Sequence, residues 1–247
     1  MTKTNPTVLI TGANGGIGNS ISKKLLENDF NLILFYKNNK NRIDDLVSDN
    51  PNSNISIFNV NLLDEKNIEN TMSSITEKFV VDSFIHTASL PPNHKQFFNF
   101  DWSEYEKYIT IEAKSFFQIS QKLIPSMKNQ KSGKLISILS SYVVGSPPTQ
   151  VSPYVVGKHA LLGLMKTMSK ELASFGIQVN SISPSMTDTT FLDSLPSKMK
   201  EIVSNQSPLK RLATVDDISS ILLFLCKNDS DYFTGENLVL SGSSVMH

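Results

Sequence analysis

Short apolar runs alternate with helical patterns along the whole chain. Continuous apolar stretches predict strands at 7–11, 31–36, 55–60, 84–86, 135–139, 177–182 and 238–240. Between them, apolar residues recur every three or four positions, which predicts helices at 65–79, 102–127, 154–175 and 216–225, and one that begins near Ile17. Apolar strands that alternate with helices predict an α/β fold, a parallel sheet of about seven strands with helices on both faces.

The composition along the chain indicates how it is divided into domains. No change of composition marks a linker, so we expect residues 1–247 to form a single domain. The least regular segment, 185–212, follows the sixth predicted strand and is rich in Ser, Pro and Thr. Ligands of open α/β sheets bind beyond the carboxyl ends of the strands, so this segment is predicted to be a substrate lid.

Composition excludes several classes of function. Lys and Arg together number 23, as do Asp and Glu, so no net field favours nucleic acid or an anionic membrane. The single cysteine, Cys226, excludes a disulfide framework. The histidines lack metal-ligand spacing, so no metal site is expected; they are His86, His94, His159 and His247. No apolar stretch is long enough to span a membrane, and we expect a soluble cytoplasmic protein.

A glycine-rich turn joins the first strand to the first helix, where residues 11–18 read TGANGGIG. Glycines let the backbone turn tightly and approach a pyrophosphate, and the helix N-terminus offers free N–H groups to phosphates. Glycine spacing alone is weak evidence, since an ordinary strand-to-helix turn can look the same. The position between the first strand and the first helix is what predicts dinucleotide binding.

Tyr154 and Lys158 lie four residues apart at the start of a predicted helix, so they share one face. A lysine cation about 5 Å away lowers the pKa of a phenol from about 10 toward neutrality, which suits acid–base catalysis. Tyr36 and Lys40 have the same spacing, so the spacing by itself is weak evidence. Context distinguishes the first pair, because Ser141 ends a strand thirteen residues before Tyr154.

The glycine turn, the Ser141–Tyr154–Lys158 set and the segment PSMTDT at 184–189 resemble the short-chain dehydrogenase/reductase family in its compact form. The resemblance covers essentially the whole chain and implies a Rossmann-type doubly wound sheet. It implies that Ser141 hydrogen-bonds a substrate carbonyl, that Tyr154 donates a proton, and that Lys158 holds the nicotinamide ribose. The implied cofactor-binding residues are Gly12, Asn14, Gly15, Gly16, Ile17, Gly18, Tyr36, Lys37, Asn61, Leu62, Thr87, Ala88, Tyr154, Lys158, Pro184, Ser185, Met186, Thr187 and Thr189.

The residues after the second predicted strand bear on the choice of dinucleotide. Enzymes that select NAD commonly place a carboxylate there, but none occurs in this chain before Asp44. Lys37, Lys40 and Arg42 follow the strand instead, where a 2′-phosphate would sit, although a solvated basic turn has the same appearance. We therefore expect NADP(H) to be preferred over NAD(H).

Several positions depart from the family pattern. The usual Asn-Asn-Ala-Gly after the fourth strand reads His86-Thr87-Ala88-Ser89, and the usual Pro-Gly reads Pro184-Ser185. Glu112 stands where the family places an Asn that holds a water linked to the lysine. A glutamate could pair with Lys158, which would hold the lysine charged and partly cancel its field on Tyr154; alternatively, Glu112 points elsewhere.

Two functions of different class follow. The first is an active NADPH-dependent ketone reductase, and its first-choice substrate is a 3-oxoacyl group on a carrier protein, because residues 206–212 and 233–236 resemble the tail of 3-oxoacyl-carrier-protein reductases. Lys210 and Arg211 could meet an acidic carrier, and a free sugar or polyol is the alternative substrate. The second function is a nucleotide-binding scaffold without catalysis. The resemblance further implies a homodimer or homotetramer, built on helices 102–127 and 154–175.

Overall fold

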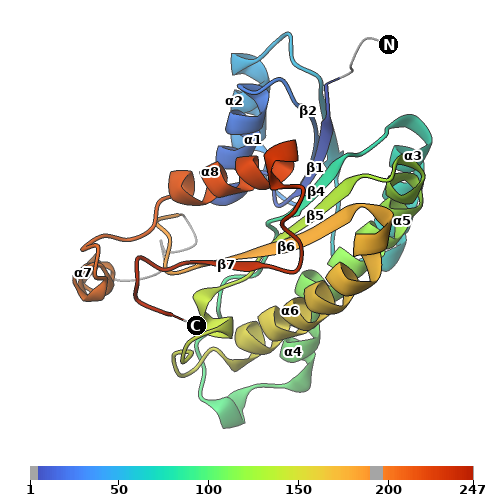
Figure 1. The fold of residues 1–247 in the computed structure, drawn as a ribbon. Coiled ribbons are helices and arrows are strands. Elements are labelled where there is room, and N and C mark those ends of the chain that lie inside the picture. The colour runs from blue at the N-terminus through green and yellow to red at the C-terminus, as the bar shows by residue number, and fades with distance from the viewer. Residues whose placement is uncertain (1–4, 190–196, 247) are drawn as a thin grey trace.

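The computed structural model describes residues 5–189 and 197–246, and within them it forms one seven-stranded parallel sheet (Figure 1). The strands lie in the order β3-β2-β1-β4-β5-β6-β7. Their bounds are β1 Thr7–Thr11, β2 Asn31–Tyr36, β3 Ile55–Asn59, β4 Ser83–His86, β5 Gly133–Ile138, β6 Ile177–Pro184 and β7 Asn237–Leu240. The predicted α/β architecture with a doubly wound sheet is therefore confirmed.

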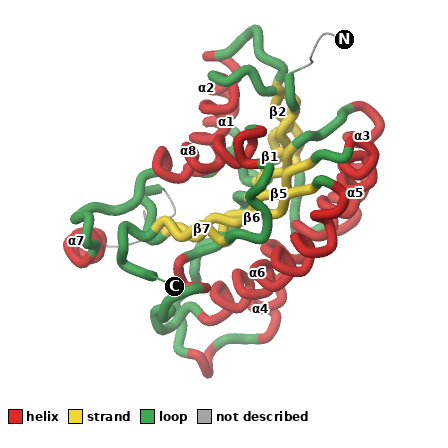
Figure 2. Tube along the Cα trace, viewed as in Figure 1, coloured by secondary structure: helices red, strands yellow, loops and turns green. Residues whose placement is uncertain are grey.

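Helices cover both faces of this sheet (Figure 2). One face carries α1 (Gly16–Leu26), α2 (Asn41–Asp49) and α8 (Val215–Cys226). The other carries α3 (Glu65–Lys78), α5 (Ser115–Gln130) and α6 (Ser152–Leu172), and α4 (Trp102–Ile109) packs on α6. A further helix, α7 (Ser197–Gln206), lies away from the sheet beyond β7 (Figure 1).

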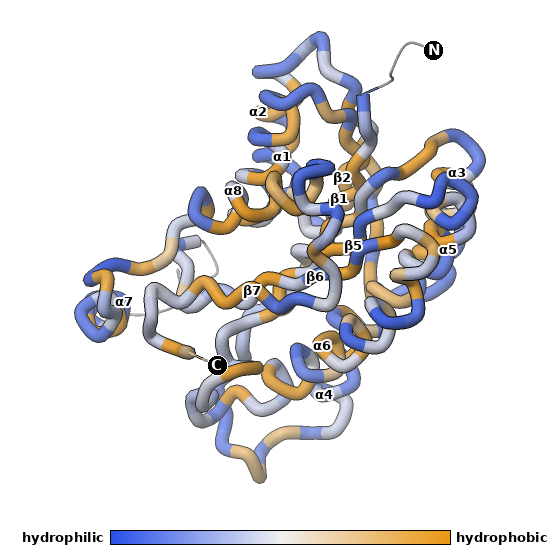
Figure 3. Tube along the Cα trace, in the orientation of Figure 1, coloured by the Kyte–Doolittle hydropathy of each residue, from blue (hydrophilic) through white to orange (hydrophobic). Residues whose placement is uncertain are grey.

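The strands supply two separate cores because successive side chains point to opposite faces. In β1, Val8 and Ile10 pack with α1 and α8, whereas Leu9 between them packs with α3 and α5. All three are fully buried. The strands therefore stay apolar along their whole length, and the colouring in Figure 3 follows this pattern through the centre of the molecule.

The chain reverses direction across the sheet at β1. It runs outward from β1 to β2 and β3, then returns to place β4 on the other side of β1 and continues outward to β7. The turns after β1 and β4 therefore diverge toward opposite faces of the sheet. Open sheets bind ligands at such a switch point, beyond the carboxyl ends of the strands.

Three local features differ from the sequence predictions. The helix predicted at 102–127 is interrupted by a π-helical turn, Thr110–Lys114, between α4 and α5. A wider turn keeps the amphipathic pattern nearly continuous, so periodicity could not reveal it. The helix α2 was not predicted because its buried face consists of only Ile43 and Leu46. The helix α7 was not predicted either and lies in the segment 185–212, which was expected to be the least regular.

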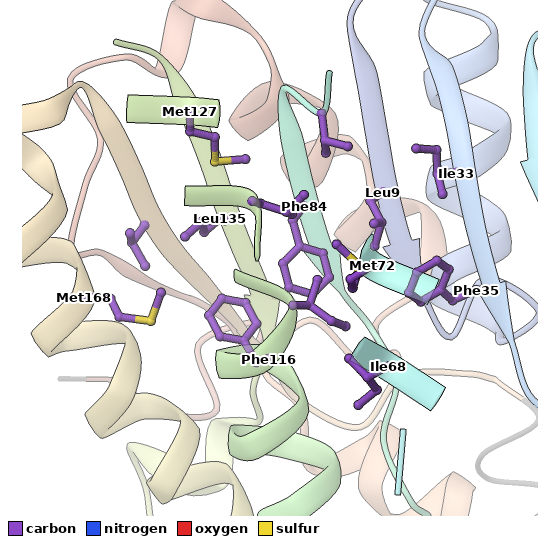
Figure 4. Packing of buried hydrophobic residues seen from close by; sticks show 14 of the residues in the cluster. Leu9, Ile33, Phe35, Ile68, Met72, Phe84, Phe116, Met127, Leu135 and Met168 are labelled. Carbon is purple, nitrogen blue, oxygen red and sulfur yellow. The ribbon is translucent and has the colours of Figure 1, made fainter. Parts of the chain in front are cut away.

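Large aromatic side chains fill the core between the sheet and α5. The rings of Phe84 and Phe116 stack with their centroids 5.2 Å apart, and both side chains are fully buried (Figure 4). Ile119 is also buried in this cluster, whereas Phe117, which follows Phe116 in the sequence, is 44% exposed. Phe116 and Ile119 therefore belong to the core, together with Leu123 and Met127 of the same helix.

We expect Phe116→Ala to lower the free energy of unfolding by about 3–5 kcal/mol, because it removes a buried ring and leaves a cavity. Denaturant unfolding followed by circular dichroism measures this loss. Phe117→Ala is the matched control and should cost less than about 1 kcal/mol. Equal losses in the two variants would contradict the packing described here.

Candidate active site

The glycine-rich turn at the end of β1 has a backbone that side chains would obstruct. Gly12 adopts a left-handed conformation with φ of +68°, and a Cβ there would lie 2.8 Å from the Ala88 backbone. A Cβ on Gly18 would overlap the carbonyl oxygen of Gly12. The helix α1 begins at Gly16 with no side chain capping its first turn. The turn therefore offers backbone N–H groups, which can bind phosphate.

The residues after β4 close one side of this turn. The Thr87 hydroxyl donates a hydrogen bond to the Thr11 carbonyl oxygen at 2.7 Å. Ala88 packs against Gly12, at a distance that only a glycine allows. Two residues predicted from the family resemblance to bind the cofactor, Thr87 and Ala88, thus lie beside the predicted pyrophosphate-binding turn.

The segment after β6 closes the other side. Pro184 ends the strand, and the Ser185 N–H donates to the Leu240 carbonyl oxygen at 2.9 Å. Thr187 forms a bridge with Ala213, and a Cβ on Gly16 would lie 2.9 Å from the Thr189 methyl group. This part of the predicted lid therefore lies over the start of α1. The lid prediction, 185–212, includes residues 190–196, which lie outside the described residues, and it stays a prediction.

A cavity of about 310 Å³ opens beside the turn, and its walls suit a phosphate. Lys23 and Arg42 contribute positive charge, opposed by the single carboxylate of Asp188. The remaining lining residues are Gly16, Asn19, Ser20, Thr189 and Val215. The glycine cradle, the uncapped helix and these cations together fit a dinucleotide.

The basic residues after β2 make different contacts. Lys40 pairs with Asp44 at 2.9 Å, which satisfies its charge locally. Arg42 instead turns toward the glycine turn, where its backbone N–H donates to the Asn14 side chain at 3.0 Å and its guanidinium lies 3.5 Å from the Asn14 carbonyl oxygen. Lys37 is exposed. Among the described basic residues that follow β2, Arg42 and Lys37 are therefore the ones not paired with a carboxylate.

The residues after β3, which were predicted to bind the cofactor, make hydrogen bonds and core contacts within the protein. The Asn61 side-chain oxygen accepts from the Leu63 N–H at 3.2 Å, and its backbone N–H donates to Asn67 at 2.7 Å. Leu62 belongs to the core. Asn61 thus shapes the turn that leads into α3.

Tyr154 and Lys158 lie on the first two turns of α6, and both are buried. The Lys158 Nζ atom is 5.6 Å from the centre of the Tyr154 ring and donates to the Ile138 carbonyl oxygen at 2.8 Å. Ser141 begins a short 3-10 turn after β5 that packs on α6, with the Tyr142 and Tyr154 rings 6.3 Å apart. The fold therefore gathers the three predicted catalytic residues at the carboxyl end of β5.

The neighbouring serine was missed by the sequence analysis. Burial raises the pKa of the Tyr154 phenol, and a hydrogen bond from Ser140 to Tyr154 opposes part of this rise. The Ser140 hydroxyl also accepts from the Tyr142 N–H at 3.3 Å. The family pattern drew attention to the second serine of the pair, and only the geometry identifies the first as a partner of Tyr154.

Glu112 lies on the π-helical turn and points at Lys158. The two side chains form an ion pair of 2.8 Å and are 0% and 2% exposed. The other carboxylate oxygen of Glu112 accepts from the Ser89 hydroxyl. The alternative in which Glu112 points away is therefore wrong for this structure.

This ion pair changes the expected behaviour of Tyr154. Burial, followed by the charge of Glu112, raises the pKa of Tyr154 well above its usual value. The prediction that Lys158 brings this pKa toward neutrality therefore does not hold for the protein by itself. The carboxylate opposes the lysine field because it lies against the same ammonium group.

His86, at the end of β4, holds the π-helical turn to the sheet. Its Nε2 lies 3.0 Å from the Ile111 carbonyl oxygen and its Nδ1 lies 2.8 Å from the Thr11 hydroxyl. A carbonyl oxygen only accepts, so Nε2 carries the proton and Nδ1 accepts from Thr11. Burial and the nearby Lys158 lower the pKa of His86 to about 3, so the ring is neutral.

Comparisons with known proteins identify relatives of the whole chain. A family model described as enoyl-(acyl carrier protein) reductase matches residues 12–242. The chain is 28% identical to a 3-oxoacyl-(acyl-carrier-protein) reductase of Staphylococcus epidermidis over 245 residues, covering 98% of this chain and 100% of that protein.

Solved structures show the same fold. The crystal structure of levodione reductase has a TM-score of 0.89 and 24% identity, with 97% of each chain covered. An NADPH dependent reductase involved in bacilysin biosynthesis has a TM-score of 0.89 and 20% identity, with 98% of this chain and 99% of that chain covered. At these identities the likeness carries the fold alone. Within residues 5–189 and 197–246, no helix is long and apolar enough to cross a membrane.

The buried neutral state of His86 predicts a pH-dependent stability. Its pKa is lower in the folded than in the unfolded chain, so below about pH 6.5 only the unfolded chain takes up this proton. The free energy of unfolding should therefore fall by roughly 1 kcal/mol per pH unit between about pH 6 and 4 on account of this group.

The measurement is denaturant unfolding of the parent and of His86→Gln at several pH values. The slope that His86 contributes should be absent from the variant. His159→Gln is the control, because His159 is exposed on α6 and should leave the slope unchanged. A parent and a His86→Gln variant with the same slope would show that His86 is not held neutral.

Proposed function

Because the chain belongs to the short-chain dehydrogenase/reductase family of oxidoreductases, we propose that it is a ketone reductase that uses NADPH. The observation that carries this proposal is the buried pairing of Tyr154 and Lys158 at the carboxyl end of β5. A phenol and an ammonium group held together there can donate a proton and bind hydroxyl groups of a ligand. A nucleotide-binding scaffold would have no need of them.

The proposed roles follow from the contacts. When bound, the reduced nicotinamide supplies a hydride to the carbonyl carbon of the substrate. Tyr154 gives its phenolic proton to the carbonyl oxygen, and Ser141 hydrogen-bonds the same oxygen. Lys158 uses two of its three N–H groups on Glu112 and Ile138, which leaves one for the ribose hydroxyls of the cofactor. The protein thus orients and polarises the reacting groups.

The proposed preference for NADPH rests on Arg42 and Lys37. Both lie past the end of β2 with no carboxylate paired to them among the described residues, and Arg42 contacts the glycine turn. A guanidinium binds a phosphate through two parallel hydrogen bonds, which a ribose hydroxyl does not offer. The NADPH dependent reductase of similar fold supports the same choice.

The proposed substrate is a 3-oxoacyl group on a carrier protein, as in the reductase of Staphylococcus epidermidis. A free small molecule is the alternative, since levodione reductase has the same fold. The two basic residues expected to meet an acidic carrier are engaged within the protein. Arg211 makes hydrogen bonds of 2.6 and 3.0 Å to Asp217, and the Lys210 ammonium donates to the Asn205 carbonyl oxygen at 2.8 Å. The carrier preference therefore rests on the sequence relatives.

Tyr154→Phe should lower the rate of NADPH oxidation with a ketone substrate by 100-fold or more, because it removes the proton donor and leaves the ring. The assay follows NADPH absorbance with an acetoacetyl thioester, a free ketone and an enoyl thioester. Tyr232→Phe is the control, since this side chain is fully exposed. A Tyr154→Phe variant that matched the parent on every substrate turned over would exclude the proposed mechanism, and binding of NADPH without turnover by the parent would favour the scaffold.

Arg42→Ala should lower kcat/KM for NADPH by about 10- to 100-fold, because one charge-assisted contact to the 2′-phosphate is lost. The same parameter for NADH should change by less than about threefold. Lys40→Ala is the matched control, because its ammonium already pairs with Asp44. Equal losses with both cofactors would mean that Arg42 supports the turn rather than the 2′-phosphate.

A further inference from the structure

The ion pair of Glu112 and Lys158 has a consequence for the protonation of Tyr154. We propose that Glu112 neutralises Lys158 and thereby keeps Tyr154 a protonated phenol throughout the neutral pH range, so that the enzyme reduces ketones at neutral pH and oxidises alcohols efficiently only in alkaline solution. Glu112 is in this sense a positioning residue that acts through Lys158. The kinetic part of the inference rests on the proposed function, but the protonation of Tyr154 does not.

The geometry of the pair supports this assignment. The carboxylate of Glu112 and the ammonium of Lys158 are 2.8 Å apart and almost fully buried. Viewed from Tyr154, whose ring centre is 5.6 Å from the ammonium, the two charges form a dipole. The potential of a dipole falls more steeply with distance than that of a single charge, and burial removes the water that would screen it. Lys158 can therefore stabilise a phenolate much less than an unpaired lysine would.

The carboxylate is held firmly in this position. Ser89 donates to its second oxygen, and Lys158 is fixed from the other side by the Ile138 carbonyl oxygen. His86 binds the Ile111 carbonyl oxygen, one residue before Glu112. The π-helical turn is thus tied to β4 through His86, and the Lys158 ammonium is tied to β5 through Ile138.

No other group near the pair restores a positive charge among the described residues. The ionisable groups that surround Glu112 and Lys158 are His86 on β4, Tyr108 on α4, Tyr142 after β5 and Tyr154 on α6. Burial and then the charge of Lys158 lower the pKa of His86, so its ring is neutral, and burial raises the pKa of Tyr108 and of Tyr142. The pKa of Tyr154 is raised by its burial and then by Glu112, in the direction that the geometry requires.

The two directions of reaction need opposite states of Tyr154. In reduction, the carbonyl carbon gains a hydride while its oxygen takes the phenolic proton, which leaves an alcohol and a phenolate. In oxidation, the phenolate removes the hydroxyl proton while the carbon returns the hydride to the oxidised cofactor. The value of kcat/KM for the ketone should therefore stay constant up to the pKa of Tyr154 in the complex with reduced cofactor. The value for the alcohol should rise tenfold per pH unit up to the pKa of Tyr154 in the complex with oxidised cofactor.

A spectroscopic titration tests the protonation directly, without cofactor or substrate. Tyrosinate absorbance near 295 nm is measured against pH for the full chain, and the same titration of Tyr154→Phe is subtracted. In the parent, the difference should show ionisation of Tyr154 only above about pH 10, or not before alkaline unfolding. The same subtraction on a Glu112→Gln background should move the midpoint down by about one pH unit or more, because the lysine charge is no longer cancelled.

Kinetic profiles of alcohol oxidation test the same shift in the complete enzyme. In Glu112→Gln, kcat/KM for the alcohol should stop rising with pH at a pH about one unit or more lower than in the parent. Glu112→Asn replaces the carboxylate with a shorter amide and should shift this pH in the same direction, so it serves if Glu112→Gln fails to fold. Glu106→Gln on α4 is the matched control, since this carboxylate is exposed and should leave the profile unchanged.

The outcomes separate this inference from the proposed function. The inference would be overturned if folded Glu112 variants kept the parent's ionisation midpoint for Tyr154 and the parent's pH dependence of kcat/KM for alcohol oxidation. This holds even if the enzyme reduces ketones. A shifted titration in a protein that turns over no ketone would support the control of Tyr154 by Glu112 and refute the proposed reaction. A fall in kcat with no change of pH profile would mean that Glu112 is only structural.

Discussion

The buried ion pair between Glu112 and Lys158 is the interaction on which the site depends. Removing two charges from water costs several kcal/mol, and a pair of this kind persists only when its remaining hydrogen-bonding groups are satisfied. Here Ser89 donates to the carboxylate, and the Ile138 carbonyl oxygen accepts a second N–H of the ammonium, whose third N–H stays available to a ligand. The pair therefore requires β4, β5, α6 and the π-helical turn to meet at one place, which is also where Tyr154 lies.

The fold could be read from the sequence because its signals are local and repeated. The strands are apolar because helices cover both faces of the parallel sheet. The turn after β1 is rich in glycine because its backbone leaves no room for a side chain at Gly12. The helix α2 escaped detection because Ile43 and Leu46 are its only buried residues. The π-helical turn escaped because one wider turn hardly disturbs the apolar stripe of a long helix.

The site was predictable in composition but not in its electrostatics. Spacing placed Tyr154 and Lys158 on one face of a helix, and both lie there. Spacing could not show that Arg42 contacts Asn14 whereas Lys40 forms an ion pair with Asp44, since Arg42 and Lys40 follow the same strand. Nor could spacing show whether the pKa of Tyr154 is raised or lowered, because that direction depends on the contact between Glu112 and Lys158 in the folded chain.

A crystal structure of the protein with NADPH would show whether Glu112 and Lys158 stay paired when the cofactor is bound. We expect the diphosphate to lie on the turn at Gly12 and the nicotinamide to face Tyr154. We also expect Lys158 to reach the ribose with one N–H while its contacts to Glu112 and Ile138 remain intact. A complex in which Glu112 has left Lys158, with the ammonium directed at Tyr154 alone, would contradict this expectation.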